Sequence, residues 1–166
     1  RSISMRLVPY SPQGAWAVAA DGRIALARSG SEYRLDWMSP DGRLVRGTPV
    51  NYRPVKVGMD NGRRSVSFIR GGNMGPPPNV DEYDWPDTKP PFLASAVTVS
   101  PDGNAWVQRS TKAGEPQRFD VFDASGNRTG EVVLPAQRRL LGFGDGVVYL
   151  AYVDEDDLQW LERYDL

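Results

Sequence analysis

Short runs in which apolar and polar residues alternate fill most of this chain, and glycine-containing turns separate them. Because successive side chains of a strand point to opposite faces of a sheet, this alternation predicts half-buried β-strands. Five turns carry Asp-Gly or Ser-Gly at comparable places: Asp21-Gly22, Asp41-Gly42, Asp102-Gly103, Ser125-Gly126 and Asp145-Gly146. A two-residue hairpin turn needs positive φ, which glycine adopts freely. The chain is therefore predicted to be a series of β-hairpins.

The strands group into two similar units. Residues 14–50 are predicted to form an antiparallel meander of four strands, at 15–18, 23–27, 33–38 and 43–46. Residues 92–134 repeat this plan, with strands at 96–99, 104–109, 117–122 and 128–134. The turn sequence Ser-Pro-Asp-Gly occurs in both units. Gly103 and Gly146 are 43 residues apart, close to the roughly 40–45 residues of a four-stranded propeller blade. The predicted fold class is all-β, built from propeller blades.

The two ends of the chain give incomplete units. Residues 138–166 supply three strands, at 139–143, 147–152 and 158–164, so the last blade lacks a fourth. Within residues 1–13, the run from Ile3 to Val8 reads as a lone strand. It is either a remnant of a preceding blade or a strand that completes the last blade and so hides its edge. The chain does not begin with Met, and we expect a processed product or a fragment.

Residues 51–91 interrupt the repeat over about one blade length. The stretch from Gly71 to Pro86 is too rich in proline and glycine for strands. Residues 60–70 are compatible with a short helix, although Gly62 and several β-branched residues oppose it. We interpret this segment as one irregular insertion on a face of the propeller, with Trp85 either packed onto that face or serving as an exposed anchor for a partner.

The composition of the chain excludes several kinds of catalytic and metal site. Hydrophobic residues make up 40% of the 166 and charged residues 25%, as in a globular domain, and the net charge of -1 gives no general attraction for nucleic acid or an anionic bilayer. The chain has neither histidine nor cysteine. This excludes Ser-His-Asp and Cys-His catalysis and zinc sites of the usual ligands. No apolar run is long enough to span a bilayer.

The chain resembles the C-terminal half of bacterial six-bladed β-propeller proteins of the NHL-like and TolB-like type. The resemblance rests on residues 19–25 with 33–37, residues 85–92, residues 100–107, and residues 149–157 with 162–164. It implies a ring of six blades, of which about three are present here. Three blades do not close alone, because each needs neighbours on both faces. The resemblance therefore implies a missing N-terminal half, a second copy, or another chain that completes the ring.

Candidate site residues are few. Asp154, Asp156 and Asp157 could bind calcium through carboxylate oxygens, but a solvated hairpin loop is the simpler interpretation. Four tryptophans lie in predicted strands and are expected to pack between blades: Trp16, Trp37, Trp106 and Trp160. The candidate partner-binding residues all belong to the insertion: Arg63, Arg64, Phe68, Tyr83, Asp84 and Trp85.

The leading functional hypothesis is a non-catalytic protein-interaction or scaffolding module. The resemblance suggests a bacterial chain at the periplasmic or outer side of the cytoplasmic membrane, as an accessory subunit of a membrane-anchored complex. One alternative is a propeller hydrolase of the lactonase or glycosidase type with a central calcium ion. A second alternative is binding of a glycan or peptide by aromatic residues such as Trp85 or Trp37 on the propeller face. No cofactor and no nucleic acid partner are expected.

Overall fold

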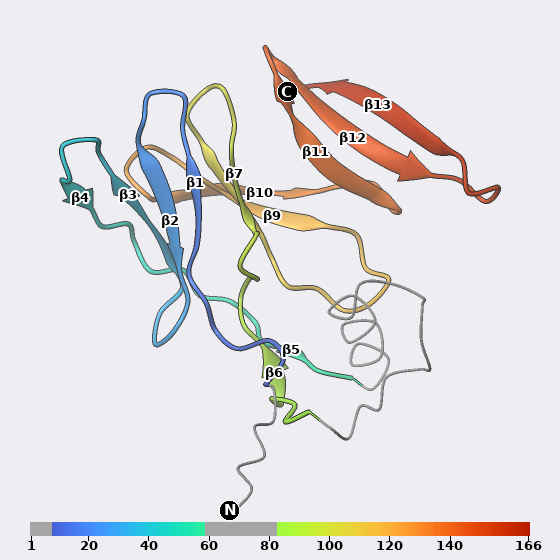
Figure 1. Cartoon of the computed structure of the whole chain (residues 1–166), viewed down its shortest axis with the longest axis horizontal. Coiled ribbons are helices and arrows are strands. Elements are labelled where there is room, and N and C mark those ends of the chain that lie inside the picture. The colour runs from blue at the N-terminus through green and yellow to red at the C-terminus, as the bar shows by residue number, and fades with distance from the viewer. Residues whose placement is uncertain (1–7, 59–82) are drawn as a thin grey trace, which may run out of the picture.

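All regular secondary structure of the described residues is β-strand. The computed structural model describes residues 8–58 and 83–166, in which the strands form four antiparallel sheets (Figure 1). The predicted all-β class is confirmed. In this part of the chain there is also no helix long and apolar enough to cross a membrane. The helix considered for residues 60–70 and nearly all of the strand expected at residues 3–8 lie outside the described residues.

The first and second sheets are four-stranded meanders. The first has the order β1-β2-β3-β4, with β1 at Ala15–Val18, β2 at Ile24–Arg28, β3 at Arg34–Met38 and β4 at Leu44–Val45. The second has the order β10-β9-β8-β7, with β7 at Val97–Val99, β8 at Ala105–Gln108, β9 at Arg118–Phe122 and β10 at Arg128–Val133. These strands lie within one or two residues of the ranges that the alternation predicts.

The third sheet is three-stranded, with β11 at Arg138–Gly144, β12 at Val147–Val153 and β13 at Gln159–Asp165. A further small sheet pairs β5 (Val55–Lys56) with β6 (Thr88–Lys89). It joins the two ends of the segment expected to be an irregular insertion. Because each of these strands has only two residues, no alternation exists to signal them in the sequence.

Four of the five turns follow one plan and differ from the expected hairpin type, whereas at Asp145-Gly146 the pairing of Gly144 with Val147 leaves the expected two-residue turn. At Gly22, Gly42, Gly103 and Gly126 the glycine has positive φ, between 77° and 85°, and its N–H donates to the carbonyl three residues earlier. The preceding Asp or Ser does not have positive φ. These are therefore three-residue loops with glycine in the left-handed region, rather than two-residue turns. In the three Asp-Gly cases the Asp carboxylate accepts the N–H two residues ahead.

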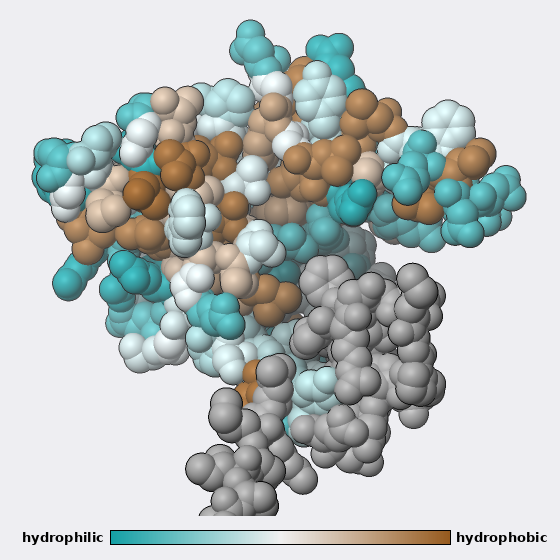
Figure 2. All heavy atoms as spheres, viewed as in Figure 1, coloured by the Kyte–Doolittle hydropathy of each residue, from teal (hydrophilic) through white to brown (hydrophobic). Residues whose placement is uncertain are grey.

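The three larger sheets pack face to face in chain order. Alternation along β8 shows the arrangement, because Ala105 and Val107 belong to the core with the first sheet whereas Trp106 belongs to the core with the third. The first core includes Leu35 and Trp37, and the second includes Leu150. Figure 2 shows a band of hydrophobic residues across these sheets, with hydrophilic residues at both ends. Within residues 8–58 and 83–166, no sheet covers the outer face of the first sheet or that of the third.

Candidate functional site

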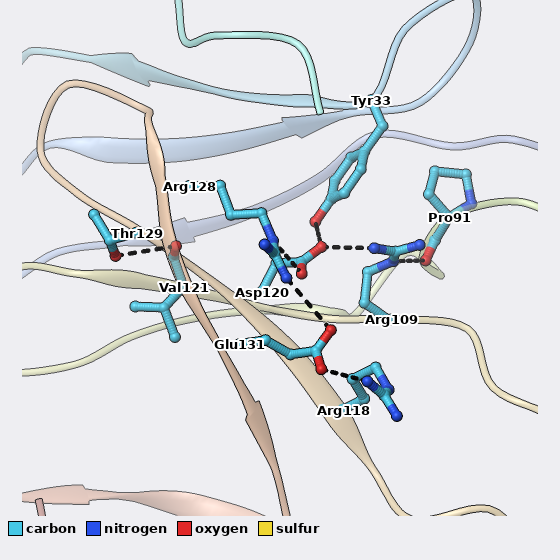
Figure 3. A network of polar contacts seen from close by, with 9 residues as sticks. All are labelled: Tyr33, Pro91, Arg109, Arg118, Asp120, Val121, Arg128, Thr129 and Glu131. Carbon is cyan, nitrogen blue, oxygen red and sulfur yellow. Dashed lines mark hydrogen bonds and ion pairs between the residues drawn. The ribbon is translucent and has the colours of Figure 1, made fainter. Parts of the chain in front are cut away.

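A buried carboxylate joins the first sheet to the second (Figure 3). Asp120, on β9, has no exposed surface. Its Oδ2 accepts hydrogen bonds from the Tyr33 hydroxyl at 2.9 Å and from Arg109 Nη1 at 2.8 Å, and its Oδ1 accepts one from Arg128 Nε at 2.7 Å. Tyr33 immediately precedes β3 of the first sheet. This contact spans 87 residues of sequence and fixes how the two sheets face each other.

Arg109 and Tyr33 hold each other in place around this carboxylate. The Arg109 guanidinium carbon lies 5.1 Å from the ring centre of Tyr33 and 5.5 Å from that of Tyr52, within the range of cation–π attraction. Arg109 Nε also donates to the carbonyl of Pro91. Burial, followed by the negative charge of Asp120, raises the pKa of Tyr33 well above its ordinary value. The phenol therefore stays protonated and remains a hydrogen-bond donor.

The first sheet repeats the second position by position. Aligning Gly22 with Gly103 and Gly42 with Gly126 places Arg28 at the position of Arg109 and Asp36 at that of Asp120. Strand pairing supports this alignment, because Leu26 lies opposite Asp36 as Val107 lies opposite Asp120. The Arg–Asp pair of Figure 3 thus has a counterpart on the outer face of the first sheet.

That outer face is apolar and exposed. Trp16, Leu26 and Asp36 form one cross-strand row, and the neighbouring row on the same face consists of Val18, Ile24, Met38 and Leu44. The equivalent of Trp16 in the second sheet is Val97, which is covered by the first sheet and only 8% exposed, whereas Trp16 is 64% exposed. Each apolar position that the second sheet buries against the first is therefore also apolar on this face.

A hollow of about 280 Å³ lies beside Asp36. Its wall includes the Arg28–Asp36 pair, the loop between β2 and β3, and Leu44 and Arg46. Asp36 itself is only 1% exposed, yet the Arg28 side chain that faces it is about half exposed. A group that enters this hollow would meet the half-exposed Arg28 guanidinium, which pairs with the buried carboxylate.

The third sheet also presents an uncovered face. Val148 and Leu150 of β12 point into the core with the second sheet, so Val153 on the same strand and Leu161 on β13 point away from it. Leu161 is 69% exposed, and Leu141 on β11 is exposed as well. The chain thus carries one apolar sheet face at each end of its stack.

A second hollow, of about 310 Å³, lies where β8 ends. Lys89, Arg109 and Ser110 are among its lining residues. Burial lowers the pKa of Lys89, and the Lys89 ammonium donates to the carbonyl of Thr111 at 2.8 Å. The Ser110 hydroxyl is buried with no hydrogen-bond partner among the described residues. Because that hydroxyl has no solvent-accessible surface, the hollow does not present it to a ligand.

Three of the predicted partner-binding residues are described, and they lie together before β6. Tyr83 and Trp85 are half-buried and Asp84 is exposed. The rings of Tyr83 and Tyr10 lie 5.8 Å and 6.1 Å from that of Trp85, which forms a small aromatic cluster. The other three predicted residues, Arg63, Arg64 and Phe68, lie outside the described residues.

The calcium candidates form a hairpin turn. Asp154 Oδ1 accepts the N–H groups of Asp156 and Leu158, and its Oδ2 accepts the indole N–H of Trp160 at 2.6 Å. Hydrogen bonding, first from Trp160 and then from the Leu158 backbone, lowers the pKa of Asp154. No group of three or more acidic residues placed to hold a metal ion occurs in residues 8–58 and 83–166.

The tryptophans divide into two pairs. Trp37 and Trp106 are buried between sheets, as expected, and the Trp37 indole donates to the carbonyl of Asp123 at 2.8 Å. Trp37 is thus unavailable to a glycan or peptide on the surface. The expectation of burial is wrong for Trp16 and Trp160, which are both more than half exposed.

The polar contact between the first and second sheets, which we call the seam, is organised by Tyr33, Arg109 and Asp120. None of these three was among the predicted site residues. One signal was available, namely the recurrence of Asp36 and Asp120 at the same offset from a turn glycine. Comparisons of the chain with family models, with curated proteins and with solved structures gave no match. Functional inference therefore starts from the exposed sheet faces and the Arg28–Asp36 pair.

Proposed function

We propose that this chain is a non-catalytic protein-interaction module whose two outer sheet faces are covered by β-sheets of other protein chains. One observation carries the proposal: the outer face of the first sheet repeats, position by position, a face that the second sheet buries. Exposed apolar patches of this kind rimmed by charged residues mark interaction sites. Trp16 is the type of residue that dominates the energetics of such interfaces.

The stacking order supports a propeller arrangement within this proposal. The first and second sheets approach each other along their first strands, β1 and β7, as neighbouring blades do around a central axis. In such a ring, the free faces of the first and third sheets would each meet a further blade. Those blades would come from a second copy or from a different chain. The proposed setting is an accessory subunit of a bacterial envelope complex on the periplasmic side.

The test is the mass of the assembly that contains the native polypeptide. We would purify the protein from its source without denaturation and determine its intact mass and its co-purifying chains. The variants Trp16→Glu and Leu161→Glu place a charge on each outer face, and both residues are exposed, so the fold of the chain should persist. Both variants are expected to leave the assembly.

Leu93→Glu is the matched control, because Leu93 is exposed but lies outside both faces. It should stay in the assembly. A native chain that sediments alone, or an assembly that retains both outer-face variants, would overturn the proposal.

A further inference from the structure

The Asp36 carboxylate has one oxygen that is incompletely engaged. Its Oδ1 accepts hydrogen bonds from Arg34 Nε at 3.0 Å and from the Gly47 N–H at 3.2 Å. Its Oδ2 has an ion pair with Arg28 Nε at 3.4 Å and no hydrogen bond from the described residues. A carboxylate oxygen accepts two hydrogen bonds readily. Oδ2 of Asp36 is therefore the oxygen that an additional donor would use.

The second sheet shows which donor fits this position. Oδ2 of Asp120 accepts from Arg109 and from the Tyr33 hydroxyl, which arrives from the sheet packed on that face (Figure 3). At Asp36 the counterpart of Arg109 is present as Arg28. Among the described residues, no neighbouring sheet lies on this face of the first sheet to supply the counterpart of Tyr33. The arginines differ in exposure, since the Arg109 side chain is 12% exposed under its covering sheet and that of Arg28 is 49% exposed, while both carboxylates are buried.

We propose that Asp36 and Arg28 form a recognition site for a tyrosine hydroxyl, carried by a β-sheet of another protein chain that docks on the outer face of the first sheet. This inference rests on the proposed function and names the chemistry by which that face selects its partner. The hollow of about 280 Å³ beside Asp36 is the place where the phenol ring enters. Leu44 is the apolar residue of its wall, and Trp16, Leu26 and Ile24 lie on the same face of the sheet outside it.

Charge also favours a neutral donor. The charge of Asp36 is already compensated by the guanidinium groups of Arg28 and Arg34. A cationic group on the partner would be repelled by these two arginines. A carboxylate on the partner would meet Asp36 and be repelled in turn. A phenol donates one hydrogen bond, carries no charge and brings a ring face on which the Arg28 guanidinium can stack, as Arg109 stacks on Tyr33.

The site departs from its counterpart at two positions, and at one of them Gly47 stands in place of Glu131. Arg128, which binds Asp120 Oδ1, is replaced in the first sheet by Leu44. Arg34 Nε and the Gly47 N–H take over this role at Oδ1 of Asp36. These changes concern Oδ1, and at Oδ2, which would receive the phenol, Arg28 takes the place of Arg109.

A small-molecule titration tests the chemistry directly. The probe is 4-methylphenol, which reproduces the tyrosine side chain, and the control is 4-methylanisole, which has the same ring but no hydroxyl hydrogen. Amide resonances of the ¹⁵N-labelled chain are followed, with that of Gly47 as the reporter because its N–H binds Asp36. The phenol should shift the Gly47 resonance saturably, and the anisole should not.

Asp36→Asn keeps an acceptor of the same shape but removes its charge, and should weaken phenol binding by at least about fivefold, since charge-assisted hydrogen bonds are roughly twice as strong. Leu93→Ala, outside the face, should leave phenol binding unchanged. Equal shifts with phenol and anisole, no saturable shift at Gly47, or undiminished binding by Asp36→Asn would overturn the proposal.

The native assembly separates this inference from the proposed function. Asp36→Asn should weaken retention in the assembly, as Trp16→Glu does. If Trp16→Glu leaves the assembly and Asp36→Asn stays fully bound, the interaction function stands and tyrosine recognition is refuted. The purified chain is also tested for self-association. If it self-associates and Trp16→Glu abolishes this, the occupant is a second copy, and a partner of another kind is refuted.

Discussion

Two glycines that close equivalent turns should respond very differently to the same substitution. Gly42 and Gly126 both have positive φ, at 84° and 77°. A Cβ added at Gly42 would meet no atom within 4 Å, whereas at Gly126 it would lie 2.4 Å from the carbonyl oxygen of Leu35 and 2.7 Å from Cα of Gly47. Gly126 is thus the point where the second sheet touches the backbone of the first.

The backbone conformation costs the two alanine variants the same. An alanine in the left-handed region loses about 1–2 kcal/mol, which is the expected loss for Gly42→Ala. Ordinary contact begins near 3.4 Å, so Gly126→Ala requires the sheets to separate by about 1.0 Å at this point. Overpacking of this kind costs a further 1–3 kcal/mol or so. We expect Gly126→Ala to lose about 2–5 kcal/mol.

Urea unfolding followed by tryptophan fluorescence measures both losses. Trp37 reports on the affected seam, because its indole donates to the carbonyl of Asp123 in the same turn. Replacing glycine by alanine also restricts the unfolded chain, but this effect is common to both variants and cancels in the difference. Equal losses for Gly42→Ala and Gly126→Ala would refute the close approach of the two sheets.

Three further outcomes follow from the polar contacts. Asp120→Asn should lose about 3–5 kcal/mol of unfolding free energy in the same urea assay, because it leaves buried guanidinium charge unpaired. Asp36→Asn should lose about 1–2 kcal/mol or less, because the arginine partners of Asp36 reach solvent. Folding raises the pKa of Tyr33, so its contribution to stability is full below the ordinary pKa of about 10 and is lost as the pH rises further. The unfolding free energy of Tyr33→Phe should therefore fall less steeply with pH in alkali than that of the unsubstituted chain. Trp160→Phe should raise the pKa of Asp154 toward its ordinary value, as measured by carboxyl-detected NMR titration.

Local rules account for what the sequence predicted well. Alternation in the two meanders depends only on which face each residue occupies, and this is visible in strands of up to six residues. Positive φ at Gly22, Gly42, Gly103 and Gly126 follows from residue type. The turn length was not predictable in the same way, because Asp-Gly suits both a two-residue turn and the three-residue loops observed.

Contacts between sheets lie beyond such rules. Tyr33 and Asp120 are 87 residues apart, and neither the hydroxyl nor the carboxylate is marked locally as buried. Trp16 and Trp37 are both tryptophans in strands of one sheet, yet one is exposed and the other buried. Their difference depends on which face has a neighbouring sheet. Sequence alternation gives two faces for every strand but does not say which of them will be covered.

The polar seam between the first two sheets also bears on how such sheets choose their neighbours. Apolar faces built from valine, alanine and leucine resemble one another, so burial alone would allow several stacking orders and offsets. A buried carboxylate is stable only in the stacking arrangement that places hydrogen-bond donors beside it, because any other arrangement leaves its negative charge uncompensated. Asp120 thus selects the sheet that carries Tyr33. By the same argument, Asp36 selects a partner that carries one tyrosine hydroxyl at the matching position along its sheet. The surrounding apolar face then supplies the affinity.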